Sequence, residues 1–153
     1  MTNHEGMTKS EARNAATAGD SFWNENRELV VREEAERNRV YDLEERTARF
    51  GEAIIDFAKT IPENPITNRL ISQLDGAGAS VGANYEEAHD AVSKKDFLKS
   101  IGTCRKEARE TKHFLRMVAP AVPDLKLQAR DLWMEARELP LIFSSIWRGP
   151  KNE

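Results

Sequence analysis

Apolar side chains recur every three or four residues between Asp42 and Ile146, which is the spacing that places them on one side of an α-helix. Four such stretches follow one another, separated by short polar or proline-containing segments. Their apolar members are Leu43, Phe50, Ile54, Phe57 and Ile61; then Leu70, Leu74, Ala77, Val81, Ala88 and Val92; then Phe97, Ile101, Cys104, Ala108, Leu115 and Val118; and finally Leu125, Leu132, Trp133, Ala136, Leu139, Phe143 and Ile146. Four amphipathic helices with short loops predict an all-α protein, an antiparallel up-down-up-down four-helix bundle.

Residues that favour helix starts stand before three of these stretches. Asp42 is followed three positions later by Glu45, a capping-box-like pair. Asn64 precedes Pro65, and proline is favoured at the first helical position. Ser93 is a candidate N-cap for the third helix, and the fourth helix is expected to begin near residue 124.

The chain divides into three parts. Residues 42–148 are the predicted bundle, residues 1–41 an N-terminal extension that is flexible or helical and partly disordered, and residues 149–153 a frayed tail. The first 25 residues lack a repeating apolar pattern, so they bury too little to offset the entropy of ordering. Phe22 and Trp23 are the exception: this aromatic pair either docks on a neighbouring surface or stays exposed.

Pro140 interrupts the apolar pattern of the fourth helix. Proline has no backbone N–H and its ring crowds the preceding turn. We therefore expect a kink or a restart of the helix there.

Composition narrows the classes of protein. Charged residues make up 32% of the chain and the net charge is −3, which argues against a general attraction to nucleic acid or anionic lipid. No apolar run approaches the roughly 20 residues of a membrane span. The single cysteine, Cys104, cannot form an internal disulfide and suits a reducing compartment. We expect a cytoplasmic protein that does not bind membranes.

Two Glu-x-x-His pairs, Glu86 with His89 and Glu110 with His113, match the spacing found in di-metal bundles. The orientation of the pairs is the test. At about 100° per residue, Glu86 and His113 lie about 180° from the apolar side of their helices, and the other two about 120° away. Both pairs are expected on the surface, so we predict no metal site and no cofactor.

The second helix contains an unusual run of small residues, "DGAGASVGAN". Each glycine costs a helix about 1 kcal/mol relative to alanine, and close approach of another helix is the preferred compensation. A phosphate-binding loop is the alternative, but the Gly-Lys-Ser/Thr ending is missing. Ser80 and Asn84 need polar partners, either in a network with the third helix (Glu107, Arg109 or Glu110) or in a binding pocket. The residues expected to pack helices or subunits are Gly76, Gly78, Ser80, Gly82, Asn84 and Glu87.

The third helix is basic. Between Lys94 and Arg116 it has eight Lys and Arg residues against three acidic residues. This ridge could neutralise nucleic-acid phosphates, or it could pair with an acidic face of another subunit. No aromatic residues alternate with these cations, so stacking on single-stranded bases is not indicated. The candidate nucleic-acid contacts are Lys95, Lys99, Lys106, Arg109 and Arg116.

Catalytic patterns are missing from the sequence. It has no Gly-x-Ser-x-Gly nucleophile turn. Cys104 belongs to the apolar stripe, where a thiol acts as a small apolar filler and not as an activated nucleophile. We expect no enzymatic activity.

Several segments resemble a known family. These are "DLEERTARFGEAIIDFAKTIP" and "QLDGAGASVGANYEEAHDAVSKKDFLKSIGTCRKEARETKHFLRM". They are similar to the bacterial four-helix-bundle family named for proteins encoded within intervening sequences of 23S ribosomal RNA. The similarity extends over about residues 42–146.

The resemblance implies a four-helix bundle that assembles into a ring-shaped homopentamer and has no enzymatic activity. Relatives that accompany diversity-generating retroelements are strongly basic and bind nucleic acid and a reverse transcriptase. This chain differs from them, since it has 17 basic against 18 acidic residues from Asp42 onward. The sequence therefore predicts a non-catalytic, self-associating scaffold. The alternative is an RNA- or DNA-binding accessory protein that uses the third helix.

Overall fold

The computed structural model describes Trp23 and residues 42–149. Expectations for the remainder of the N-terminal extension, and for residues 150–153, lie outside the described residues. The described chain is helical and contains no strand, which confirms the all-α prediction. Its elements are α3 (Leu43–Ala58), α4 (Pro65–His89), α5 (Lys94–Ala121), a single 3-10 turn η1 (Pro123–Leu125) and α6 (Lys126–Arg148).

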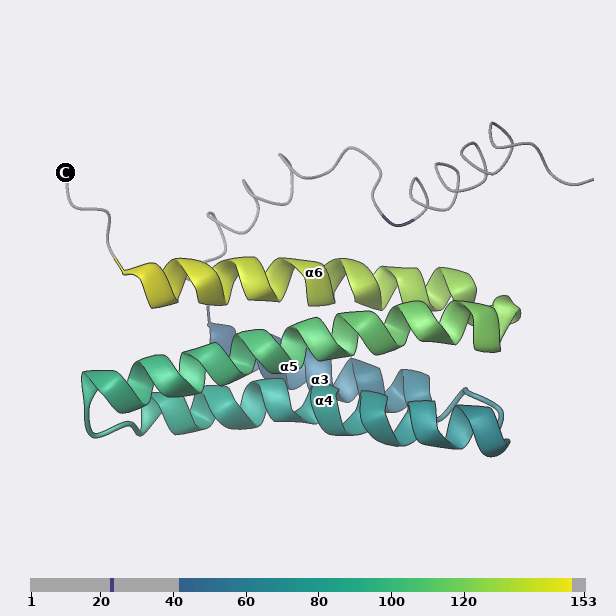
Figure 1. Cartoon of the computed structure of the whole chain (residues 1–153), viewed down its shortest axis with the longest axis horizontal. Helices are drawn as coiled ribbons and strands as arrows, with labels where there is room; N and C mark the ends of the chain where they lie inside the picture. Colours follow the sequence, from purple (N-terminus) through teal and green to yellow (C-terminus); the bar gives the residue numbers. More distant parts are fainter. Residues whose placement is uncertain (1–22, 24–41, 150–153) are drawn as a thin grey trace, which may run out of the picture.

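The four helices form an up-down-up-down bundle in which each helix packs on the next in sequence (Figure 1). The pairs α4–α5 and α5–α6 are in contact over most of their lengths. The contact between α3 and α6, which closes the bundle, is much smaller. The reason is partly length: α3 has 16 residues and α5 has 28, about 24 and 42 Å at 1.5 Å per residue.

The helices begin where the sequence predicts. The Asp42 carboxylate accepts a hydrogen bond from the N–H of Glu45 at 3.2 Å. The Asn64 side chain accepts from the N–H of Thr67 at 3.0 Å, and the Thr67 hydroxyl accepts from the N–H of Asn64 at 2.9 Å. The Ser93 hydroxyl accepts from the N–H of Asp96 at 3.1 Å. Each contact satisfies a backbone donor that has no partner inside the helix.

Two boundaries differ from the sequence expectation. Helix α3 ends at Ala58, and Ile61 is buried from the turn that follows it. Helix α6 runs without interruption from Lys126 to Arg148, so the restart considered at Pro140 does not occur. Pro140 is itself buried, and its ring removes one backbone hydrogen bond from the helix.

The apolar stripes meet in a single core. Its fully buried large side chains include Ile54 from α3, Leu74 from α4, Ile101 from α5, and Leu139 and Phe143 from α6. Val92 is an error of the sequence pattern, because it lies in the turn after α4 and is 94% exposed. The stripe therefore ends with the helix, one turn earlier than the spacing alone suggests.

Candidate interaction surfaces

Helices α3 and α4 approach each other closely, and glycines make this possible. A Cβ atom on Gly78 would lie 2.7 Å from Cγ2 of Ile54. A Cβ on Gly51 would lie 3.4 Å from the carbonyl oxygen of Gly78, and one on Gly82 would lie 3.4 Å from Oγ1 of Thr47. We call this contact, formed by Thr47, Gly51, Ile54, Gly78 and Gly82, the α3–α4 seam.

The other members of the small-residue run lie elsewhere. A Cβ on Gly76 would meet no atom within 4 Å. The Ser80 hydroxyl donates to the Gly76 carbonyl at 2.6 Å, and the Asn84 amide donates to the Ser80 carbonyl at 2.8 Å. These side chains thus bond within α4, and not to the third helix as the sequence suggested. Glu87 is exposed, and a role of this set in subunit packing stays a prediction.

A shallow groove of about 270 Å³ lies directly on the seam. Its α3 side is formed by Glu44, Thr47, Ala48, Gly51, Glu52 and Ile55, and its α4 side by Ala79, Gly82, Ala83 and Glu86. The floor is thus made mainly of glycine and alanine, and three carboxylates stand around it. We call it the acidic groove.

The pKa of Glu86 is affected by its position in the groove. Desolvation raises the pKa of Glu86, and the nearby Glu44 carboxylate adds to the rise by charge repulsion and by sharing a hydrogen bond. Carboxylates held close together favour a positively charged neighbour. The sequence contains a signal for this face that was not used: Glu44, Ala48 and Glu52 follow one another at intervals of four residues on α3.

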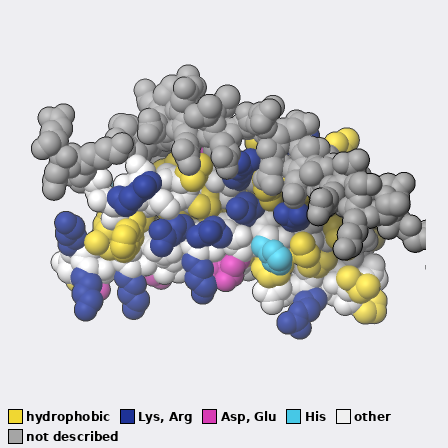
Figure 2. Space-filling model, turned by 45° about the horizontal axis from the view of Figure 1, so that its top comes forward, with side chains coloured by type: hydrophobic (Ala, Val, Ile, Leu, Met, Phe, Trp, Pro, Cys, Tyr) yellow, Lys and Arg dark blue, Asp and Glu magenta, His cyan; other side chains and the backbone are white. Residues whose placement is uncertain are grey.

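The basic ridge on α5 is accessible. All five candidate contacts, Lys95, Lys99, Lys106, Arg109 and Arg116, have exposed side chains. Lys106 lies 3.9 Å from Glu110, an exposed pair of little energetic consequence. Figure 2 shows Lys and Arg side chains gathered over the α5–α6 side of the bundle, with few acidic ones among them. The ridge therefore presents a strong positive charge on a helix distinct from the two that form the acidic groove.

Aromatic rings lie beside three other cations, Arg105, Lys112 and Arg137, a feature that the sequence analysis missed. Trp133 of α6 lies beneath Lys112 of α5, whose Nζ is 6.0 Å from the ring centroid, and beside Arg137, whose Cζ is 5.5 Å away. Arg105 is likewise 5.8 Å from the ring of Trp147. The contacts of Lys112 with Trp133 and of Arg105 with Trp147 arise only where α6 packs against α5, whereas Trp133 and Arg137 are four residues apart on α6 itself.

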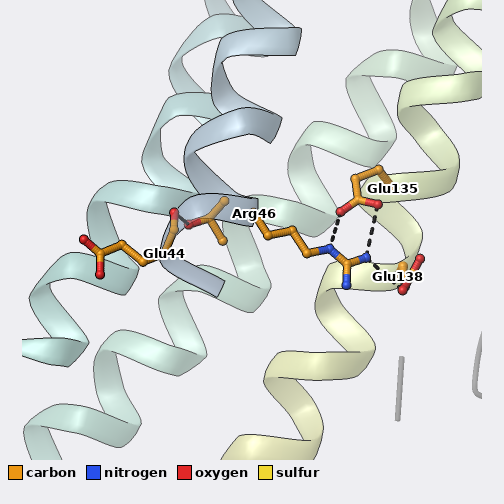
Figure 3. Close-up of polar contacts among 5 residues, drawn as sticks. Glu44, Arg46, Glu135 and Glu138 are labelled. Carbon is orange, nitrogen blue, oxygen red and sulfur yellow. Dashed lines mark hydrogen bonds and ion pairs between the residues drawn. The ribbon is translucent and has the colours of Figure 1, made fainter. Parts of the chain in front are cut away.

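Arg46 joins α3 to α6 through two carboxylates (Figure 3). Its Nε lies 2.7 Å from Oε1 of Glu135, and its Nη2 lies 3.1 Å from Oε2 of Glu135 and 2.8 Å from Oε1 of Glu138. Glu138 is buried in the described bundle. Glu44, on the same helix as Arg46, points away towards the acidic groove. We call Arg46, Glu135 and Glu138 the ion triad.

The triad is a structural contact between helices. Burial by itself would lower the pKa of Arg46, but hydrogen bonds and charge attraction from Glu135 and Glu138 outweigh it and raise that pKa. A charge taken out of water needs such partners. Sequence reasoning missed the triad, although Arg46 stands between Leu43 and Phe50 on the apolar side of its helix.

The Glu-x-x-His pairs do not converge. The side chains of Glu86, His89 and His113 are exposed and that of Glu110 is half-buried. Among the described residues no group of three or more His, Cys, Asp and Glu side chains is arranged to hold a metal ion. Cys104 is fully buried, and burial raises the pKa of its thiol to about 12, which keeps it protonated and unreactive.

Comparison with known proteins agrees with this architecture. Residues 39–121 match the family model described as 23S rRNA-intervening sequence protein. The chain is also similar to a crystal structure from Bacteroides thetaiotaomicron, a protein of unknown function from the S23 ribosomal protein family. The identity is 22%, the TM-score is 0.52, and the match covers 77% of this chain and 98% of that one, which supports the fold. No curated protein matches. In the part of the chain that the structure describes, no helix is both long and apolar enough to cross a membrane.

Proposed function

Because the chain belongs to the 23S rRNA-intervening sequence protein family, we propose that it is a non-catalytic scaffold of the bacterial cytoplasm that assembles with copies of itself. The assembly is a ring-shaped homopentamer. In each contact the basic ridge on α5 of one protomer lies in the acidic groove between α3 and α4 of the next. The function is then self-association, and no reaction is catalysed.

The observation that carries this proposal is the match between the two surfaces. The acidic groove has carboxylates at Glu44, Glu52 and Glu86 and a floor without long side chains. Lysine and arginine have long aliphatic stems. These stems can lie on the glycine and alanine floor of the groove while the charged ends reach the surrounding carboxylates. Complementary charge of this kind fixes the register of a contact and excludes wrong partners.

The arrangement of the two surfaces supports a ring. The ridge and the groove are different parts of one protomer, so the contact is head-to-tail and leaves a ridge and a groove unused at the two ends of any open chain. A head-to-tail contact closes into a ring when its rotation allows and otherwise continues as a filament. Five protomers is the ring size that family resemblance implies.

Charge reversal combined with light scattering tests the proposal. The wild-type protein is expected at the mass of five protomers of 17.4 kDa. K99E/K106E and, separately, E44K/E52K should each weaken association at least tenfold, which corresponds to about 1.4 kcal/mol. In a mixture of the two variants, contacts between unlike protomers are complementary again, so association should return. Two kinds of protomer cannot alternate around five positions, so this assembly should form open chains or even-numbered rings and no closed pentamer.

K59E/R69E is the matched control, since it reverses two exposed charges that belong to neither surface. Its mass should equal that of the wild type. A wild-type protein that is monomeric at micromolar concentration would contradict the scaffold. A pentamer unaffected by both reversals would retain the scaffold and reject this interface.

A second candidate is an RNA- or DNA-binding accessory protein. The specific observation in its favour is the placement of Trp133 and Trp147 beside Lys112, Arg137 and Arg105, because nucleic-acid surfaces combine cations with rings. Gel shifts over a range of salt concentrations test it. K99E/K106E should weaken binding and reduce its salt dependence, whereas E44K/E52K, which leaves the ridge intact, should not weaken it. Binding that K99E/K106E leaves unchanged would exclude the ridge.

A further inference from the structure

Trp23 packs on α6, far from its own place in the sequence. Its side chain is only 7% exposed, and its ring centroid lies 5.2 Å from that of Trp133, at an interplanar angle of 57°. Trp133 is itself 4% exposed and belongs to the hydrophobic core. Aromatic pairs at this separation add to the stabilisation that burial of the rings provides.

The position that Trp23 occupies has a distinct chemistry. Trp133 forms the aromatic base, and Lys112 and Arg137 lie over or beside its ring. Desolvation lowers the pKa of Lys112, and the positive charges of Arg109, Arg137 and Arg116 lower it further. Cations therefore surround the ring of Trp133. The indole of Trp23 is a neutral, flat and electron-rich group that packs against this ring. We call Trp133, Lys112 and Arg137 the tryptophan slot.

We propose that Trp23 is an intramolecular anchor that occupies the tryptophan slot and covers it against single-stranded nucleic acid. A base packed against Trp133 would compete with Trp23 for contact with this ring, and its phosphates would approach Lys112 and Arg137. Trp23 is covalently part of the chain, so its local concentration at the slot is high and it competes without an external partner. This inference does not depend on the ring assembly.

The choice of the chain's own tryptophan as the occupant rests on the observed contact. The 18 residues from 24 to 41 separate Trp23 from the start of the bundle. Eighteen residues can span up to about 60 Å, more than the length of any helix here, so the connection can reach α6 within one protomer.

The test uses the full-length chain and two readouts. Two indole rings this close couple electronically and give an exciton couplet in the far-ultraviolet circular dichroism spectrum. W23F and W23A should both abolish the couplet, whereas W147F should retain it because Trp147 is not part of the pair. The second readout is the affinity for oligothymidylate, a single-stranded probe without secondary structure.

The two Trp23 variants distinguish the packing of Trp23 on Trp133 from its competition with nucleic acid. W23A opens the slot and should bind oligothymidylate about fivefold or more tightly than wild type. W23F still places a ring in the slot and should bind like wild type. A couplet that survives in W23A, or equal oligothymidylate affinity of W23A and wild type, would overturn the proposal. A couplet that fades on dilution together with the particle mass would also overturn it, because Trp23 would then come from a second copy.

Discussion

Helix α3 is held to its two neighbours in opposite ways. Against α4 the contact is close: Gly78 has no side chain, so Ile54 lies directly on the backbone of the facing helix. Against α6 the contact is small and polar, and Arg46 reaches across to Glu135 and Glu138. One interface thus gains stability by bringing backbones together, and the other bridges a wider separation with long charged side chains.

The comparison shows what each contact can tolerate. At Gly78 the seam has no spare volume, so an added Cβ requires Ile54 to shift, whereas a Cβ at Gly51 or Gly82 would lie at ordinary van der Waals distance. The ion triad depends on charge instead: two carboxylates share one guanidinium, and a buried charge without its partner is costly. Three substitutions test this difference, beginning with the largest expected effect.

Removal of Arg46 should be the most damaging change. R46A leaves Glu135 and the buried Glu138 facing each other, and we expect a loss of about 2–3 kcal/mol in the free energy of unfolding. The value lies below that of a fully buried pair because the Arg46 and Glu135 side chains keep 20% and 32% of their exposure. Urea unfolding at a fixed protomer concentration measures it.

R49A is the matched control for R46A. Arg49 pairs with Glu45 at 2.8 Å on the same helix, but both side chains are largely exposed. Such a pair contributes about 0.5 kcal/mol or less. Equal losses for R46A and R49A would mean that the triad is no more than a surface contact.

Addition of one methyl group at Gly78 should come next. Alanine there meets Cγ2 of Ile54 at 2.7 Å, and overpacking of this kind outweighs the gain in helix propensity. We expect G78A to lose about 1–2 kcal/mol net. In an I54A background the same change should cost less, because Cγ2 and Cγ1 of residue 54 are gone and only its Cβ, at 2.9 Å, remains in the way. An additive double mutant would contradict the seam as described.

Substitution of Gly76 should change the free energy of unfolding least, and should increase it. A Cβ there meets no atom within 4 Å, so G76A gains helix propensity without crowding. We expect about 0.5–1 kcal/mol of added stability, visible as a higher midpoint in urea. If G76A destabilised the assembled protein but not a dissociated variant such as K99E/K106E, Gly76 would belong to a contact between protomers.

Sequence reasoning succeeded where the cause is local. Caps at Asp42, Asn64 and Ser93 and the apolar stripes depend on residues within one or two turns, and the helices begin at these positions. The prediction that Val92 belongs to the apolar stripe was wrong, because the spacing of apolar residues continues in the sequence beyond the end of helix α4. The restart considered at Pro140 does not occur, since α6 is continuous through it, whereas the kink stays a prediction.

The features missed are those that join distant parts of the chain. Arg46 and Glu135 are separated by 89 positions in the sequence. Lys112 and Trp133 come from different helices, so the aromatic and basic pattern exists only after folding. Glycines in α4 indicated a close approach, but the sequence did not say that α3 would be the approaching helix or that Gly51 would take part. The topology of the bundle decides which helices lie side by side. A single sequence predicts the class of fold, but not which residues of two helices come into contact.

The floor of the acidic groove is also the line along which α3 meets α4, since Thr47, Gly51 and Gly82 belong to both. A neighbouring protomer seated there would press the two helices together from outside. A protomer that loses its neighbour would lose this support at the point where α3, the shortest of the four, is joined to the remainder. We therefore expect heat to detach α3 first in dilute solution, and crowding by other copies to postpone that step.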